Sequence, residues 1–190
     1  MTAKKSLDNL KGKPFTRKDI LKLGLSGNDI AELLSRGQIE RVSRGIYRFA
    51  GEELSDPELF RAATIRIAGP SVICLLSALA YYQLTDSIPK KVWMMTEKHK
   101  RTIHKDIRLF RSRNPHLDIG IQKDQGFMIT TIDRTLVDCL VQRKLIGTNV
   151  AIEGLRRALK FRKVSLSGII KVAERLGVEH RIHPYIESFS

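Results

Sequence analysis

Apolar positions in the first fifty residues follow a helical spacing twice in succession. In residues 16–24 and again in 26–37, a hydroxyl residue precedes a short helical run and a glycine follows it. Hydroxyl side chains favour the N-cap of a helix, and glycine favours the residue that ends one. Ile30, Leu33 and Leu34 fall at i, i+3 and i+4, so one face of the second run packs inward. The pattern predicts two short helices joined by a tight turn, a helix-turn-helix.

The pattern then changes to short runs of β-forming residues. Residues 39–42 and 46–49 are two such runs, separated by Ser-Arg-Gly. Gly45 can adopt the positive φ that a tight hairpin turn requires. We therefore expect a β-hairpin, which in this position would be the wing of a winged helix-turn-helix.

The remainder of the chain mixes helical and strand patterns. Helices are predicted for residues 56–68 and 75–82. Strands are predicted for residues 92–95, 107–110, 119–121 and 126–129, and the last two strands are joined around residues 123–125. After Asp133 the chain is predicted to be helical again, in about three pieces broken near residues 147 and 165. The predicted fold class is α+β. We expect residues 1–52 to form a winged helix-turn-helix, and residues 53–190 to form a mixed α/β C-terminal body with a small sheet and C-terminal helices.

The net charge of the chain indicates which class of partner it binds. The chain has 34 Lys and Arg against 20 Asp and Glu, a formal net charge of +14. A surplus of this size favours polyanions, above all nucleic acid. Cys74 and Cys139 each lie in an apolar stretch, which indicates buried thiols in a reducing compartment. Because no apolar run approaches the roughly 20 residues of a membrane span, we expect a cytoplasmic protein that does not bind a membrane.

The candidate DNA contacts lie on the outward faces of the two helices and on the hairpin. Residues at the start of a recognition helix meet base edges, whereas flanking cations mostly hold phosphates. Glu32 counts against base reading, because a carboxylate there either accepts from cytosine or repels phosphate. The alternative is that these are solvated charges of a domain that contacts only protein. The expected DNA contacts are Lys18, Lys22, Asn28, Ser35, Arg36, Arg41, Arg44 and Arg48.

A second basic set lies in residues 90–113. These residues either extend the DNA-binding surface, bind an acidic partner, or prevent aggregation through an exposed sheet edge. Its members are Lys90, Lys91, Lys98, Lys100, Arg101, Lys105, Arg108, Arg111 and Arg113.

Three segments together resemble one protein family. They are GLS at 24–26 with RGQIERVSRGIYR at 36–48, LSALAYYQLTD at 76–86 followed by Ile88-Pro89, and TIDRTLVDC at 131–139. In this order the segments resemble the AbiEi-like antitoxins, which are transcriptional regulators of type IV toxin-antitoxin systems.

The resemblance implies an antitoxin that represses its own operon by binding promoter repeats through the winged domain. It further implies that the C-terminal body carries antitoxicity and assists cooperative DNA binding. The implied functional partner is a toxin resembling a nucleotidyltransferase, which the antitoxin need not bind directly. A stand-alone repressor with no toxin partner is the alternative, and a neighbouring toxin-like gene would distinguish the two.

The third segment carries paired charges that have two interpretations. Thr131 or Asp133 can cap a helix, and Asp138 follows Arg134 by four residues, so the two can pair on one helical face. A structural or interface role is favoured, with Arg134 as the alternative site residue of the C-terminal body.

Catalytic and metal sites lack the residues that they need. His99 with His104, and His180 with His183, have no Cys or carboxylate at a metal-ligand spacing. A nuclease would need clustered carboxylates, and the only candidates near the predicted strands are Asp118 and Asp124, with Lys123. There is also no phosphate-binding glycine loop and no nucleophile elbow. We therefore expect a protein that is not an enzyme and needs neither metal nor cofactor, with a nuclease as the less favoured alternative.

Overall fold

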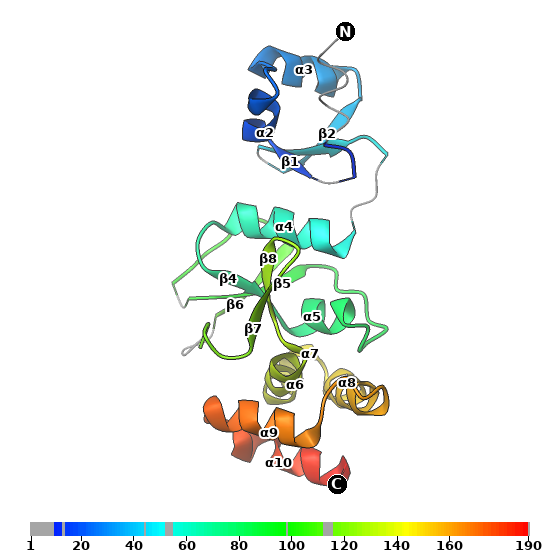
Figure 1. Cartoon of the computed structure of the whole chain (residues 1–190), viewed down its shortest axis with the longest axis vertical. Helices are drawn as coiled ribbons and strands as arrows, with labels where there is room; N and C mark the ends of the chain where they lie inside the picture. The colour runs from blue at the N-terminus through cyan, green and yellow to red at the C-terminus, as the bar shows by residue number, and fades with distance from the viewer. Residues whose placement is uncertain are drawn as a thin grey trace. The chain divides into compact units, whose positions relative to one another are not determined.

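The computed structural model describes residues 10–12, 14–43, 45–51, 55–97, 99–111 and 116–189. The chain divides into two compact units, Met1–Arg66 and Ile67–Ser190. Helices and two small sheets alternate along it (Figure 1), so the predicted mixture of α and β structure is confirmed. The domain boundary expected after residue 52 remains a prediction.

The first unit contains the two predicted helices and a small sheet. Helix α2 spans Arg17–Lys22 and helix α3 spans Gly27–Ser35. Strands β2 (Ile39–Ser43) and β3 (Ile46–Phe49) form the predicted hairpin, and the short strand β1 (Phe15–Thr16) pairs with the other edge of β3. This arrangement fits a helix-turn-helix followed by a β-hairpin.

A small apolar core holds the first unit together. Phe15, Ile20, Ile30, Ile39 and Tyr47 are buried in it, one from each of the two helices and three strands. Each element therefore buries one face against the others, as the sequence pattern predicts.

Helix α4 (Asp56–Ile67) ends the first unit and has the predicted bounds to within one residue. The carboxylate of Glu58 accepts hydrogen bonds from the backbone N–H and the hydroxyl of Ser55, at 2.7 and 2.6 Å. These two hydrogen bonds at the N-terminus of the helix stabilise its first turn.

The second unit contains a mixed five-stranded sheet in the order β6-β5-β4-β8-β7. Its strands are β4 (Ser71–Ile73), β5 (Val92–Thr96), β6 (Ile107–Arg111), β7 (Ile121–Asp124) and β8 (Phe127–Thr130). The pairs β4–β5 and β7–β8 are antiparallel, whereas β4–β8 and β5–β6 are parallel. The central strands β4, β5 and β8 carry the buried Ile73, Met94, Met95 and Ile129.

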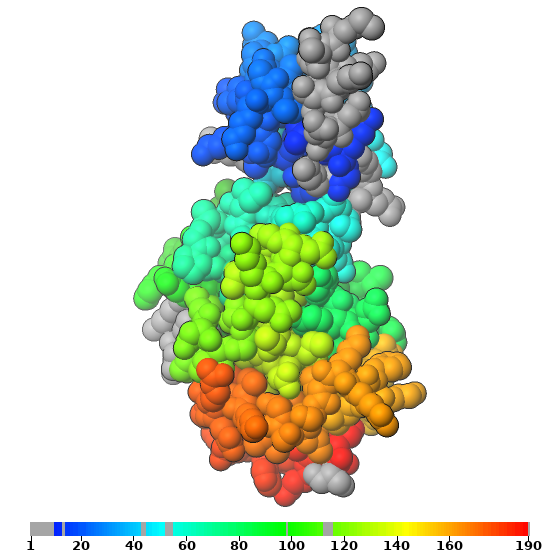
Figure 2. Space-filling model, in the orientation of Figure 1, coloured from blue at the N-terminus to red at the C-terminus, as the bar shows by residue number. Residues whose placement is uncertain are grey.

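Helix α6 lies at the centre of the helical part of this unit. The helices are α5 (Leu75–Tyr81), α6 (Ile132–Val141), α7 (Arg143–Ile146), α8 (Thr148–Lys160), α9 (Leu166–Arg175) and α10 (Glu179–Ile186), followed by the short 3-10 helix η1 (Glu187–Phe189). Helix α6 packs against α5, α8, α9 and α10. The C-terminal helices form the orange and red part of this unit's surface in Figure 2. No helix among the described residues has both the length and the apolar character needed to cross a membrane.

Trp93 fixes β5 against its neighbours. Its indole is buried, its backbone N–H donates to the Ser77 hydroxyl of α5 at 2.9 Å, and the Arg108 guanidinium of β6 lies 4.2 Å from the ring centre. The cation over the aromatic face adds an attraction to the packing of the two parallel strands. Cys74 and Cys139 are buried thiols, as predicted, and burial raises the pKa of both well above the usual value.

Several predicted bounds in the second unit are wrong. Strand β7 begins at Ile121 and includes Lys123 and Asp124, which the sequence placed in the turn. The turn is instead Gln125–Gly126, with φ of +40° and +91°, the geometry of a two-residue hairpin. The strand cannot begin at residue 119 because Gly120 has a φ of +62°.

Other elements were missed altogether. Strands β1 and β4 contain only two and three residues, too few to show an alternating pattern. The described part of the C-terminal region, from residue 132 to residue 189, contains five α-helices and not three, because Gln142 and Gly177 add breaks to those near 147 and 165.

Gly120 provides a sharp test of this packing. A Cβ at this position would lie 2.6 Å from Arg134 Cβ, and the left-handed φ is itself costly for alanine. We expect Gly120→Ala to lower the free energy of unfolding by about 2–4 kcal/mol. Urea unfolding of the full chain measures it.

Gly177→Ala is the matched control for the conformational cost. Gly177 has a similar φ of +65° with nothing within 4 Å of the added Cβ. This variant should be destabilised by only about 1 kcal/mol, from the unfavourable φ. Equal losses of stability in the two variants would show that the close approach to Arg134 is unimportant.

Candidate nucleic-acid interface

Two capping boxes position the helices of the first unit. At α2 the Asp19 backbone N–H donates to the Thr16 hydroxyl, and the Asp19 carboxylate accepts from the Thr16 backbone N–H at 2.8 Å. At α3 the Ser26 and Asp29 groups repeat this exchange, with the Ser26 N–H 2.6 Å from the carboxylate. The Ser26 hydrogen bonds lower the pKa of Asp29. Both helix starts are therefore fixed by local contacts, as the sequence predicts.

Helix α2 presents two lysines to solvent. Ile20 is completely buried, and Lys18 and Lys22, which lie two residues before and after it, are exposed. Lys18 and Lys22 are four residues apart and share one face of the helix. This is the outward face that the sequence predicted.

Helix α3 presents Asn28, Ser35 and Arg36 to solvent, but two of the three are already engaged. The Ser35 hydroxyl donates to the Glu32 carbonyl at 2.9 Å. The Arg36 guanidinium lies 2.5 Å from the Glu32 carboxylate, with both side chains more than half exposed. Asn28, near the start of the helix, is exposed, and its side-chain amide has no hydrogen-bond partner among the described residues.

The hairpin carries two arginines with different surroundings. Arg48 donates from Nε and Nη2 to Glu40 Oε2 at 3.2 and 2.8 Å, and this contact lowers the pKa of Glu40. Arg41 is exposed and lies 5.8 Å from the centre of the Tyr47 ring. Arg44, the third candidate of the hairpin, lies outside the described residues.

Arg17 belongs with these candidates, although its position at the start of α2 gave no sequence signal for DNA contact. Its side chain is exposed, and its Nη2 atom would be 3.2 Å from a Cβ placed on Gly27, the first residue of α3. Its backbone N–H donates to the Gly45 carbonyl at 3.1 Å. Arg17 therefore stands where α2, α3 and the hairpin meet.

The distribution of ion pairs separates the cations into two groups. All four carboxylates of residues 14–51 are engaged within the unit: Asp19 and Asp29 cap helices, Glu32 pairs with Arg36, and Glu40 pairs with Arg48. Four cations of this segment have no carboxylate partner among the described residues. These four, which we call the open cations, are Arg17, Lys18, Lys22 and Arg41.

The C-terminal candidates lie at the N-cap of α6 and within this helix, and Arg134 is the buried one among them. Thr131 is the N-cap and accepts from the Arg134 backbone N–H at 3.4 Å, while Asp133 is partly buried and burial raises its pKa. Arg134 is only 3% exposed, and its Nε donates to Asp138 Oδ2 at 2.9 Å. The predicted cap and the predicted i,i+4 pair are thus confirmed.

Arg134 also connects α6 to the segment before β7. Its Nη1 donates to the His116 and Ile119 carbonyls at 3.1 and 2.6 Å, and its Nη2 lies 3.6 Å from Met95 Sδ of β5. Burial raises the pKa of Asp138 to about 6, while the Arg134 guanidinium favours the charged form. These contacts join α6 to β5 and to the segment before β7.

The carboxylates considered for a nuclease do not converge. Asp118 is exposed, and Asp124 Oδ2 accepts from the Tyr81 hydroxyl of α5 at 2.8 Å. His183 pairs with Glu187 at 3.4 Å. In the part of the chain that the structure describes, no three His, Cys, Asp or Glu side chains gather as a metal site requires.

The first unit is thus a helix-turn-helix with an adjacent β-hairpin and a set of open cations. Residues 7–50 match the family described as transcriptional regulator, AbiEi antitoxin. The predicted resemblance is confirmed over these residues, which make up less than half of the chain. The segments at 76–89 and 131–139 lie outside the match, and no curated protein matches the chain.

The buried position of Arg134 predicts a large effect on stability. Arg134→Ala removes the partner of a buried carboxylate, and it should lower the free energy of unfolding by about 3–5 kcal/mol. Urea unfolding monitored by Trp93 fluorescence measures this loss. Arg156→Ala, which breaks an exposed i,i+3 pair with Glu153, is the control and should have little effect. A similarly small effect of Arg134→Ala would contradict the structural role.

Proposed function

We propose that this protein is a DNA-binding transcriptional repressor that acts as the antitoxin of a type IV toxin-antitoxin system. The observation that supports it most is the set of open cations on α2 and β2, in a segment that matches AbiEi antitoxin regulators. Cations without a carboxylate partner are the groups that gain most from phosphate contacts.

In this proposal α3 is the recognition helix and the β2–β3 hairpin is the wing. Asn28 reads a base edge, because it lies at the start of α3 and its amide can donate and accept at once. Lys18 and Lys22 bind phosphates on one side, and Arg17 and Arg41 bind phosphates beside the hairpin. Arg36 and Arg48 contribute less, since each is held by a carboxylate.

The wider biology of the proposal rests on the resemblance to the AbiEi-like antitoxins. The repressor binds repeats in its own promoter, and its functional partner is a nucleotidyltransferase-like toxin that it counteracts in the cytoplasm. The protein performs no catalysis of its own.

The first experiment is binding of the purified chain to its own promoter DNA and to a scrambled duplex across a range of salt concentrations. We expect tighter binding to the promoter and a steep salt dependence, because cation–phosphate contacts release counterions. Equal affinity for both duplexes would contradict a sequence-specific repressor, and no binding to either would contradict DNA binding itself.

The open cations and Arg48, which is paired with Glu40, should contribute differently to the salt dependence of DNA binding in the same titration. Lys18→Gln with Lys22→Gln should reduce the slope of log affinity against log salt by about two, roughly one for each phosphate that a lysine no longer neutralises. Arg48→Gln should reduce it by clearly less than one, because Glu40 already holds the guanidinium. The assignment of the open cations fails if Arg48→Gln has the larger effect.

The antitoxin role is tested by co-expression with the neighbouring toxin-like gene. The wild-type chain should restore growth, and the Lys18→Gln, Lys22→Gln variant should restore growth while losing repression of a promoter fusion. This separation is expected because the resemblance implies that antitoxicity belongs to the C-terminal body. Failure of the wild-type chain to restore growth would leave a repressor that is not an antitoxin.

A further inference from the structure

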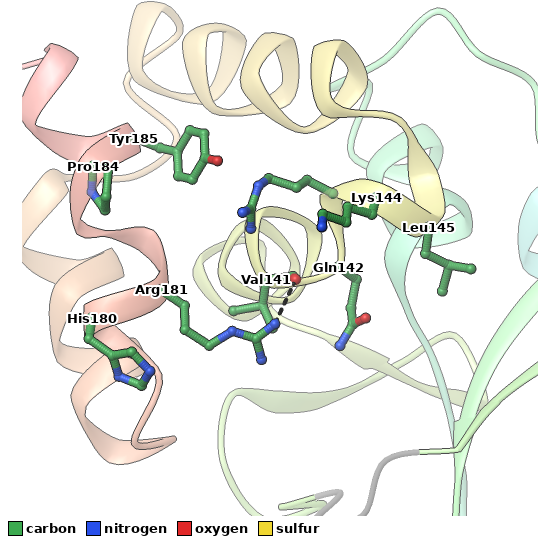
Figure 3. A pocket seen from close by; sticks show the side chains of 9 residues that line it. Val141, Gln142, Lys144, Leu145, His180, Arg181, Pro184 and Tyr185 are labelled. Atoms are coloured by element: carbon green, nitrogen blue, oxygen red, sulfur yellow. Dashed lines mark hydrogen bonds between the residues drawn. The ribbon is translucent and has the colours of Figure 1, made fainter.

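A basic pocket lies in the second unit, far along the chain from the open cations. It has a volume of about 500 Å³ and lies between residues 141–145, at the α6–α7 corner, and α10. Figure 3 shows Arg181 and Tyr185 extending from α10 toward this corner, with Lys144 projecting from the other side. All of the lining residues belong to the second unit.

The charge of the pocket has one sign. Arg143, Lys144, His180 and Arg181 line it, and none of the described residues in its wall is a carboxylate. Two arginines and one lysine supply three positive charges at neutral pH. Cations gathered in a concave wall create a field that attracts an anion.

Two of the three cations are held in place by backbone and ring contacts. Arg143 Nη1 donates to the Leu140 carbonyl at 3.2 Å, and its guanidinium lies 4.8 Å from the centre of the Tyr185 ring. Arg181 Nη2 donates to the Val141 carbonyl at 3.2 Å (Figure 3). A guanidinium has five N–H donors, so each arginine retains donors for a ligand. Their positions are therefore set before a ligand arrives, which lowers the entropic cost of binding.

Size and donor type together select the class of ligand. The volume lies within the range of roughly 300–1,000 Å³ that is usual for small-molecule sites. Guanidinium forks match the oxygen geometry of phosphate, and several cations together favour a polyvalent anion. We propose that this pocket binds a small molecule that carries an oligophosphate group, independently of DNA binding by the first unit.

Calorimetric titration of the full chain with sodium tripolyphosphate tests the proposal. A second titration, with ATP, shows whether a base and a sugar increase the affinity. The pocket variant combines Lys144→Gln with Arg181→Gln. The control variant combines Lys171→Gln with Arg175→Gln, which removes the same charge from exposed positions of α9 outside the pocket. Circular dichroism verifies that both variants are folded.

We expect tripolyphosphate to bind the wild type, at least tenfold weaker binding to the pocket variant, and less than a twofold change in the control. The NMR resonance of the His180 ring, assigned with a His180→Gln variant, should shift as the wild type saturates. Equal weakening in both variants, or no shift of His180, would show general charge attraction and overturn the proposal. It is also overturned if promoter DNA displaces tripolyphosphate and the pocket variant loses its DNA affinity, because the pocket would then belong to the DNA-binding surface.

Discussion

The second unit depends on the burial of one positive charge. The Arg134 guanidinium is removed from water, so each of its donors has to find a partner inside the protein. Asp138 supplies a carboxylate one helical turn away, and the His116 and Ile119 carbonyls supply acceptors from another part of the chain. The segment before β7 is thereby held against α6, and Gly120 meets this requirement because it has no side chain to collide with the arginine. Sheet and helices are joined at this point.

The first unit was predictable because its signals are local. The Thr16 and Ser26 caps, and the glycine of the hairpin, each act within a few residues of their own position, and the structure has them where the sequence indicates. The pairing of Arg48 with Glu40 was not predictable in the same way. It joins residues that are brought opposite each other only by the register of β2 and β3. The sequence therefore identifies most cations of the candidate interface, but it missed Arg17 and does not tell which of the cations are neutralised.

The second unit was predicted less well because the arrangement of its strands and helices is set by contacts between segments that are distant in the sequence. Strand β4 has three residues, and its parallel pairing with β8 joins Ile73 to Ile129. No periodicity within one segment specifies such a partner. The basic pocket has the same origin: its walls come from residues 141–145 and from α10, which are separated by two helices in the chain. The i,i+4 pair of Arg134 and Asp138 was predictable, whereas the carbonyl partners of the arginine were not.

Trp93 gives the chain a built-in optical reporter. It is the only tryptophan of the sequence, and it lies in β5 with its indole buried beneath the Arg108 guanidinium. The first unit contains no tryptophan, so intrinsic emission excited selectively at the indole band originates from the second unit alone. Melting of the first unit can therefore leave the emission unchanged while circular dichroism falls. Comparison of the two signals along one denaturation curve separates the stabilities of the two units without cutting the chain or attaching a dye.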